Sequence, residues 1–303
     1  MNPANDTNWI TKFNIHVTSN SNKVFGNGRH QLEVSVSVTP KAGVEISDEQ
    51  LDSIRLVTLD DDGAYQELDG ELHMSSERDK RFEYYADTGG APQALLAANS
   101  RRRRFYVSST RSGGSLDVIY AAISKDEETQ YVSNTSKFNT SITLETLTPL
   151  RLTREDMTLS VEDNYEHTVN ATDWDYDVYQ MYPNSRHLKW VASIPYGPGS
   201  GIPYYQTTVE DNGFFADGEP KSYTHLAFEV STRRRFKAPT TDISVNRRPG
   251  SMVFIRIKTF GPVTLTGAQN RTSRWGLLDQ YGNEQQIEMT QTSDGNLIDF
   301  IVI

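Results

Sequence analysis

The chain has 303 residues, of which 36% are hydrophobic and 23% are charged, and its formal net charge is −10. This length suits two domains of the usual size, about 100–200 residues each. The absence of cysteine excludes disulfides, thiolate metal sites and thiol nucleophiles. The negative charge, which both halves share, argues against nucleic acid as a partner, because nucleic-acid binding needs a positive surface.

The N-terminal part of the chain has the period-two pattern of β-strands. Residues 32–38 alternate apolar and polar side chains without a fault, which predicts one buried and one solvated face. Residues 54–59 and 65–68 predict two strands joined by a turn at 60–63, where three aspartates precede a glycine. We favour this turn over a metal site there. Helix signals are limited to one turn capped by Ser47 and an alanine-rich segment at 91–98.

Strands are predicted along the rest of the chain at residues 104–108, 116–123, 140–144, 158–161, 187–193, 224–230, 252–258 and 263–266. The segment 276–302 predicts a three-stranded meander. Short strands separated by turns are typical of antiparallel sandwiches. We therefore expect an all-β protein.

Two pairs of similar segments predict an internal duplication. The arginine-rich residues 100–105 resemble residues 231–236, and Lys-Phe-Asn at 12–14 recurs at 137–139. We expect two tandem immunoglobulin-like antiparallel β-sandwich domains, at residues 9–134 and 135–303. Phe13 should then be equivalent to Phe138, and Phe105 to Phe236, with all four rings buried. A repeat of this length is a domain rather than a solenoid unit.

Residues 27–38, Asn-Gly-Arg-His-Gln-Leu-Glu-Val-Ser-Val-Ser-Val, are followed by Thr39-Pro40. This segment resembles the opening of bacterial immunoglobulin-like domains of the invasin and intimin type, in which a Gly-rich turn precedes an alternating valine strand. The resemblance covers about 30 residues of the chain. It implies a β-sandwich used for display or binding in a bacterial or phage protein, and it carries no site residues.

The arginine runs at 101–104 and 233–235 have two interpretations. They could bind a polyanion, or they could pair with carboxylates of neighbouring strands. We favour pairing, because alternate arginines of a strand point to opposite faces and do not form one patch. Arg102 or Arg104, and Arg233 or Arg235, are therefore expected to contact a carboxylate of their own domain.

An acidic strand is the first candidate site. Asp173, Asp175 and Asp177 alternate with Trp174 and Tyr176, which places three carboxylates on one face and two rings on the other. Carboxylates this close repel one another, so calcium or an arginine partner is expected to relieve them. A charged edge strand that resists aggregation is the alternative.

An aromatic segment is the second candidate site. Its centre, from Tyr196 to Tyr205, is rich in glycine and proline. We expect Tyr196, Tyr204 and Tyr205 to be partly exposed and close together at one end of the second domain, and to bind a partner together with Trp174 and Tyr176. The alternative is that these rings fill a core, as we expect for Trp190 and Phe228.

Six scattered histidines and the absence of catalytic motifs favour a protein that is not an enzyme. We expect a structural or adhesive binding protein of a bacterial or phage surface or particle, acting through a protein partner or self-assembly. A carbohydrate-binding, lectin-like module and a secreted toxin subunit without a signal peptide are the alternatives. We expect no cofactor other than calcium at the acidic strand.

Neither a secretory signal nor an apolar run long enough for a membrane helix is present. We therefore expect a soluble protein, made in the cytoplasm. If it acts outside the cell, a signal-peptide-independent route or a particle would carry it there.

Overall fold

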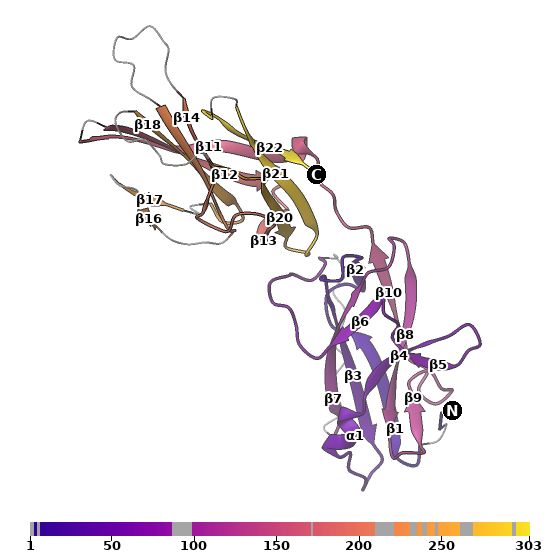
Figure 1. Cartoon of the computed structure of the whole chain (residues 1–303). Coiled ribbons are helices and arrows are strands. Elements are labelled where there is room, and N and C mark those ends of the chain that lie inside the picture. The colour runs from indigo at the N-terminus through magenta and orange to yellow at the C-terminus, as the bar shows by residue number, and fades with distance from the viewer. Residues whose placement is uncertain are drawn as a thin grey trace. The chain divides into compact units, whose positions relative to one another are not determined.

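The structure is a computed structural model that describes residues 3–4, 7–86, 99–170, 172–209, 221–230, 235–237, 241–245, 248–260, 269–292 and 295–303. Over these ranges it is all-β apart from one short helix and one 3-10 turn (Figure 1). The chain forms two compact units. Unit 1 comprises Met1–Leu150 with Tyr281–Asn283, and unit 2 comprises Arg151–Gln280 with Glu284–Ile303.

Unit 1 contains two β-sheets and the helix α1 (Asp48–Asp52). The first sheet has the order β1-β3-β7-β6, formed by β1 (Ile10–Val17), β3 (Leu32–Pro40), β7 (Arg101–Ser109) and β6 (Leu72–Ser75). The second has the order β2-β10-β8-β4-β5, with β9 also paired to β8. Its strands are β2 (Lys23–Phe25), β10 (Ile142–Leu147), β8 (Leu116–Ser124), β4 (Arg55–Leu59), β5 (Tyr65–Glu67) and β9 (Gln130–Val132). β2 and β10 pair in parallel, and the other ladders are antiparallel.

The two sheets of unit 1 enclose one apolar core. Val34 and Phe105 are register partners in the first sheet and contribute to this core, as do Ile119 and Leu144 from the second. Strand β10 falls within the range 135–303, yet it pairs with β8 and β2 of unit 1. The division between the units therefore follows Leu150 rather than residue 134, the predicted boundary.

Strand β3 alternates as predicted, but both of its faces are covered. Val34, Val36 and Val38 lie in the core, and Ser35 and Ser37 are also buried. β3 is a central strand, and the register partners of these two serines on β7 are Arg104 and Arg102. Long arginine side chains cover neighbouring surface with their methylene groups. The predicted solvated face is therefore shielded, although its residues are polar.

Unit 2 contains a six-stranded sheet of order β11-β12-β18-β15-β14-β19 and a four-stranded sheet of order β13-β20-β21-β22. The large sheet is formed by β11 (Met157–Val169), β12 (Thr172–Pro183), β18 (Met252–Phe260), β15 (Lys221–Phe228), β14 (Pro203–Val209) and β19 (Gln269–Asn270). The smaller sheet is formed by β13 (Trp190–Pro195), β20 (Ser273–Asp279), β21 (Glu284–Gln291) and β22 (Ile298–Val302). A 3-10 turn, η1 (Arg154–Asp156), precedes β11.

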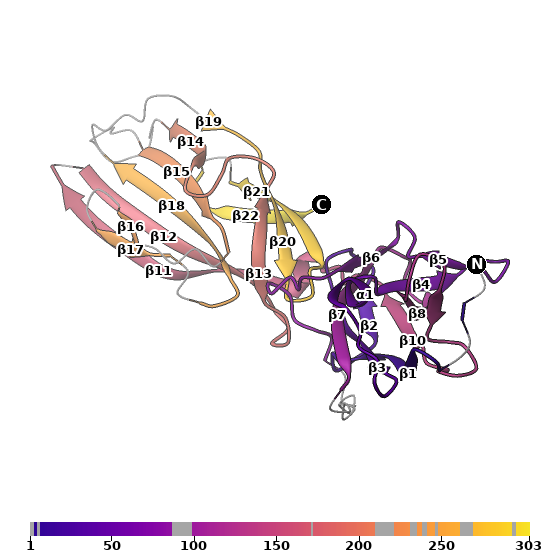
Figure 2. The same cartoon turned by 90° about the horizontal axis from the view of Figure 1, so that it is seen from below.

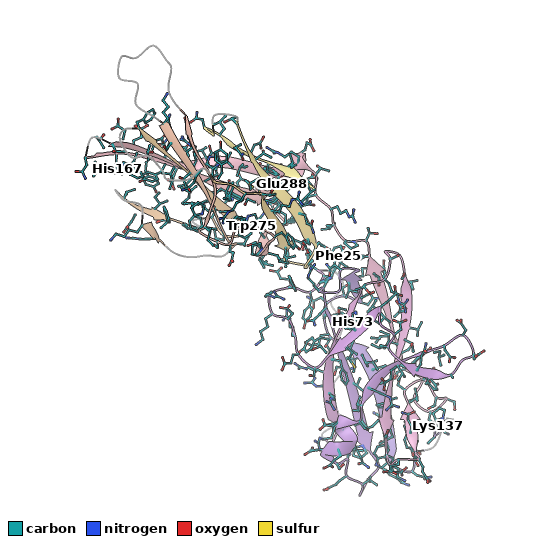
Figure 3. All side chains as sticks on the ribbon, viewed as in Figure 1. Phe25, His73, Lys137, His167, Trp275 and Glu288 are labelled. Carbon is teal, nitrogen blue, oxygen red and sulfur yellow. The ribbon has the colours of Figure 1, made fainter. Side chains whose placement is uncertain are left out.

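The large sheet of unit 2 has an apolar cluster on each face. One cluster joins Tyr179 and Phe254 to Trp275 and Ile287 of the smaller sheet. Figure 3 labels Trp275, which belongs to strand β20 of the smaller sheet. The other cluster joins Tyr176 and residues of β15 and β18 to the segment around β17 (Asp242–Ser244), which pairs with β16 (Arg235–Lys237). The two-stranded ribbon β16–β17 thus covers the second face of the large sheet (Figure 2).

The predicted equivalence of the phenylalanines is wrong. Phe13 and Phe138 do not occupy matching places in two domains, because their rings meet edge to face, 6.1 Å apart, in the core of unit 1. Phe105 is buried at the centre of β7, whereas Phe236 is half-buried on the three-residue strand β16. The strand orders of the two units also differ. The similar segments therefore do not occupy equivalent structural positions.

Several local predictions are confirmed. Ser47 caps α1 in a capping box with Gln50. The predicted turn at 60–63 joins β4 to β5, with the Gly63 N–H donating to the Asp60 carbonyl and a positive φ of 78° at Gly63. The C-terminal meander is β20, β21 and β22. The segments 91–98 and 263–266 lie outside the described residues.

Among the described residues, no helix is long and apolar enough to cross a membrane.

Candidate functional site

The arginine run of unit 1 pairs with local carboxylates, as predicted. Arg104 Nε lies 3.5 Å from a carboxylate oxygen of Glu33 on the neighbouring strand β3. Arg103, which points to the other face, donates to Asp52 of α1 at 2.7 Å. In the second run, Arg235 lies 3.9 Å from Asp242. Arg233 and Arg234 lie outside the described residues.

The acidic strand is β12, and its counter-charge is an arginine. Asp173, Asp175 and Asp177 have Phe260, Lys258 and Arg256 as their register partners on β18. Arg256 Nη2 donates to Asp175 Oδ2 at 2.9 Å, and its Nε donates to Asp177 Oδ2 at 2.8 Å. Asp173 instead accepts a hydrogen bond from Thr168 Oγ1 at 2.7 Å.

The Arg256 cluster is buried: the arginine side chain is 5% exposed and the Asp177 side chain 12%. Burial opposes the charge of Arg256, but the adjacent Asp177 and Asp175 carboxylates outweigh it and raise the arginine pKa. The described residues contain no group of three or more histidine and carboxylate side chains able to hold a metal ion. Arg256 is therefore the cationic partner of Asp175 and Asp177, the arginine alternative that the sequence allowed for these carboxylates.

A polar cavity of about 460 Å³ lies beside this cluster. It is lined by Glu166, His167, Thr168, Asp173, Trp174, Asp175, Lys258 and Phe260. Lys258 Nζ lies 4.5 Å from the centre of the Phe260 ring, within cation–π range. Figure 3 shows His167 at one end of unit 2, where β11 turns into β12.

The two predicted aromatic residues of β12 differ in accessibility. Trp174 and Tyr176 stack with their ring centres 6.1 Å apart and their planes at 10°. Tyr176 is fully buried in the cluster beneath β16–β17, so it cannot contact a ligand. Trp174 is half-buried and borders the polar cavity, and it remains a candidate binding residue.

The tyrosines of the glycine- and proline-rich segment are separated rather than gathered. Tyr204 and Tyr205 belong to strand β14 and are buried in the core of unit 2, where the Tyr205 ring lies 4.8 Å from His225. The prediction that they are exposed is therefore wrong. Tyr196 is 50% exposed, and its hydroxyl donates to Glu284 Oε1 at 2.5 Å. The strand begins at Pro203, so the loop is shorter than the sequence indicated.

A cleft of about 690 Å³ lies in unit 1, between β4 and β8. The β4–β8 ladder joins Arg55–Val57 to Tyr120–Ala122 and ends there. In Figure 1 the β4–β5 hairpin then projects away from β8. Leu116–Ile119 pairs with β10 on its other side, and no described strand pairs with its β4-facing edge. We call this space the β4–β8 cleft.

Apolar side chains line both sides of the β4–β8 cleft. Leu116 is 67% exposed and Val118 is 43% exposed on β8, and Leu59 of β4 is also exposed. Alternate residues of a strand share a face, so Leu116 and Val118 continue the face on which Ala122 packs against Val57 and Val132. That apolar face is covered at Ala122 and uncovered in the cleft.

The charged lining of the β4–β8 cleft is mainly negative. Four carboxylates, those of Asp60, Asp61, Asp69 and Asp117, line it with the single guanidinium of Arg111. Arg111 is already shared among Asp69, Glu71 and Asp117, with its Nη1 donating to Glu71 Oε2 at 2.7 Å. The cleft therefore keeps an excess of negative charge.

Asp117 has one carboxylate oxygen without a partner in the part of the chain that the structure describes. Its Oδ2 is shielded from solvent and accepts no hydrogen bond from the described residues. Burial raises the pKa of Asp117, and the nearby Asp69 and Glu71 add to this effect, while Arg111 opposes it. A cation that entered the cleft would stabilise the ionised form of Asp117.

The β4–β8 cleft was not predicted from the sequence, although one sequence pattern is consistent with it. Residues 116–123 have apolar side chains on both faces of the strand, including Leu116 and Val118 opposite the core residues Ile119 and Ala121. A strand of this kind is either covered on both faces or leaves an apolar face exposed. No pattern in the sequence indicates where β4 separates from β8.

No family model matches this sequence, and no curated protein matches it either.

Proposed function

We propose that this chain is a non-enzymatic structural or adhesive binding protein that contacts a protein partner through the β4–β8 cleft of unit 1. A bacterial or phage surface or particle is the setting that the sequence resemblance suggests. The proposal rests on one observation, the exposure of Leu59, Leu116 and Val118 around a stretch of β8 with a free edge. Exposed apolar side chains that line the same cleft favour an interaction site there.

The cleft suits protein better than a small apolar ligand. Its volume lies within the usual range of about 300–1,000 Å³ for ligand sites. Its lining, however, combines exposed aliphatic side chains with four carboxylates, so an occupant must supply apolar contacts and positive charge together. A peptide segment of another protein offers both.

Selection of random peptides on the whole chain tests this proposal. Peptides that bind the wild-type protein should lose binding to a Leu116→Lys/Val118→Lys variant, because both side chains are exposed and their replacement removes the apolar contacts. Peptides that bind the wild type and the variant equally well would place the binding surface elsewhere and overturn the proposal.

Carbohydrate recognition at the polar cavity of unit 2 is the second candidate function. It is favoured by the half-buried Trp174 beside Asp173, Glu166 and Lys258, since an aromatic ring with nearby polar groups suits sugars. Retention on a glycan array that a Trp174→Ala variant loses would support this function. Retention by wild type and variant alike would exclude this cavity as the sugar site.

A further inference from the structure

The β4-facing edge of β8, with which no described strand pairs at Leu116–Ile119, has the geometry for strand addition. Leu116–Ile119 spans four residues, or about 13 Å at the usual rise of a strand. In a strand, alternate residues direct their N–H and C=O groups to the same side. Two of these four residues therefore present their backbone groups toward the β4–β8 cleft rather than toward β10.

The opposite wall of the cleft also has a free edge. Beyond Val57, β4 continues through Thr58 and Leu59, which pair with Gln66 and Tyr65 of β5 on the side away from β8. No described strand pairs with the β8-facing side of Thr58 and Leu59. Two strand edges thus face a common space of about 690 Å³.

Natural sheets commonly protect such edges with inward-pointing charge or cover them with another segment. Here the exposed residues of β8 are Leu116 and Val118, which do not discourage pairing. The carboxylates instead surround the edge, with Asp117 between the two apolar residues and Asp60 and Asp61 at the opposite wall. The negative charge of these carboxylates favours a positively charged segment as the partner of this edge and disfavours a negatively charged one.

We propose that the β4–β8 cleft receives an extended segment of a partner protein, which adds as a strand to the Leu116–Ile119 edge of β8 and carries lysine or arginine between apolar residues. This inference rests on the proposed function and specifies its partner. Backbone hydrogen bonds provide the affinity of strand addition, and alternate side chains provide its specificity. The apolar residues pack on Leu116, Val118 and Leu59, and a basic residue pairs with Asp117.

The test uses the whole chain and three synthetic eight-residue peptides. The first peptide alternates valine and lysine, the second alternates valine and glutamate, and the third is the first with alternate backbone nitrogens methylated. We expect the valine–lysine peptide to bind. Glutamate and N-methylation should each weaken binding by at least about tenfold, because they remove charge complementarity and backbone donors respectively.

Variants of the protein test whether the valine–lysine peptide binds in the β4–β8 cleft. Val118→Lys should weaken binding of the valine–lysine peptide by at least about tenfold, since it adds a like charge at the edge. Val161→Lys is the matched control, because Val161 is a similarly exposed strand valine of unit 2, and it should leave binding unchanged. Circular dichroism of each variant shows whether the fold is retained.

The outcomes separate the inference from the proposed function. Equal binding of the methylated and unmethylated peptides, with loss in Val118→Lys, would overturn strand addition and leave protein binding at the cleft intact. Binding that Val118→Lys does not change would overturn the site. Failure of the valine–lysine peptide to bind, when selected peptides bind through Leu116 and Val118, would overturn the proposed partner chemistry. If no selected peptide binds through these residues either, the proposed function fails as well.

Discussion

Arg256 donates from Nε to Asp177 Oδ2 at 2.8 Å, across two neighbouring strands and with both side chains buried. Asn296 also receives a hydrogen bond from Arg256 Nη1, at 3.1 Å. The guanidinium therefore links β18 both to β12 and to the turn before β22. A buried charge of this kind depends on its partners, because its desolvation is expensive.

Replacing Arg256 with alanine should lower the free energy of unfolding by about 3–5 kcal/mol, since Asp177 would then be a buried, unpaired carboxylate. Arg256→Met/Asp177→Leu, which removes both charges, should recover much of this loss. Arg274→Ala is the control: its partner Glu288 lies at 2.8 Å on the exposed face, and the expected cost is about 0–1 kcal/mol. Denaturant unfolding measures all three, and equal costs for the two single variants would contradict the structure.

Millimolar calcium should not raise the melting temperature. Asp175 and Asp177 face Arg256, and a second cation there would meet its positive charge. Thermal unfolding in calcium and in chelator measures the effect, because any ion that binds the folded state raises its stability by mass action. A rise that an Asp173→Asn/Asp175→Asn variant abolishes would show that β12 binds calcium after all.

Tyr204 and Tyr196 should respond oppositely to truncation. Tyr204→Ala should cost about 3–5 kcal/mol, as loss of a large buried ring does. Tyr196→Ala should cost less than about 1 kcal/mol, because its ring is half-exposed and its hydroxyl bonds to Glu284 at the surface. Comparable costs would mean that the segment before β14 packs differently.

The Tyr204→Phe variant tests the hydroxyl of this side chain separately from its ring. The Tyr204 hydroxyl is buried and has no hydrogen-bond partner among the described residues, and burial raises its pKa. Removing a buried, unpaired polar group is neutral or stabilising. The unfolding free energy of Tyr204→Phe should therefore equal or exceed that of the wild type. A clear loss of stability would reveal a partner for this hydroxyl.

Stability should fall on mild acidification. Burial lowers the pKa of His225 to about 4, with Arg256 adding to the decrease, and burial lowers the pKa of His30 to about 4 as well. Below pH 6.5 the unfolded chain takes up protons that the folded histidines do not. Each histidine therefore removes up to about 3 kcal/mol of stability as the pH falls from about 6.5 to about 4, and no more below that.

Chemical unfolding between pH 7 and pH 4 measures this dependence. His225→Gln should make this dependence shallower, because the variant lacks one of the two buried histidines whose pKa is lowered. An unchanged pH dependence in His225→Gln would mean that this histidine takes up its proton as readily in the folded protein as in the unfolded chain.

The alternating pattern of residues 32–38 was sufficient to predict strand β3, because period-two alternation is a local property. A local pattern of this kind does not show whether two similar segments occupy equivalent positions in the fold. Lys-Phe-Asn recurs at 12–14 and 137–139, but Phe13 and Phe138 pack on each other, a contact that depends on how distant segments fold together. Similar short segments do not determine equivalent positions in a fold.

The candidate site likewise depends on contacts between residues that are far apart in the sequence. Alternation placed Asp175 and Asp177 on one face of β12, and charge repulsion correctly required a cationic partner, but Arg256 is far along the chain. The exposure that the glycine- and proline-rich composition predicted for Tyr204 and Tyr205 is also wrong. The loop ends at Ile202, and these rings belong to a strand. The β4–β8 cleft depends on where one ladder ends, which no local pattern specifies.

Hydrogen–deuterium exchange of the whole chain, with and without a saturating valine–lysine peptide, tests the central claim most directly. We predict slower exchange at the amides of residues 116–119 and 57–59, where the added strand would lie, and unchanged exchange at residues 157–161 of unit 2. Slower exchange confined to unit 2, or no change at residues 116–119 when the peptide is bound, would contradict the assignment of the β4–β8 cleft as the binding site.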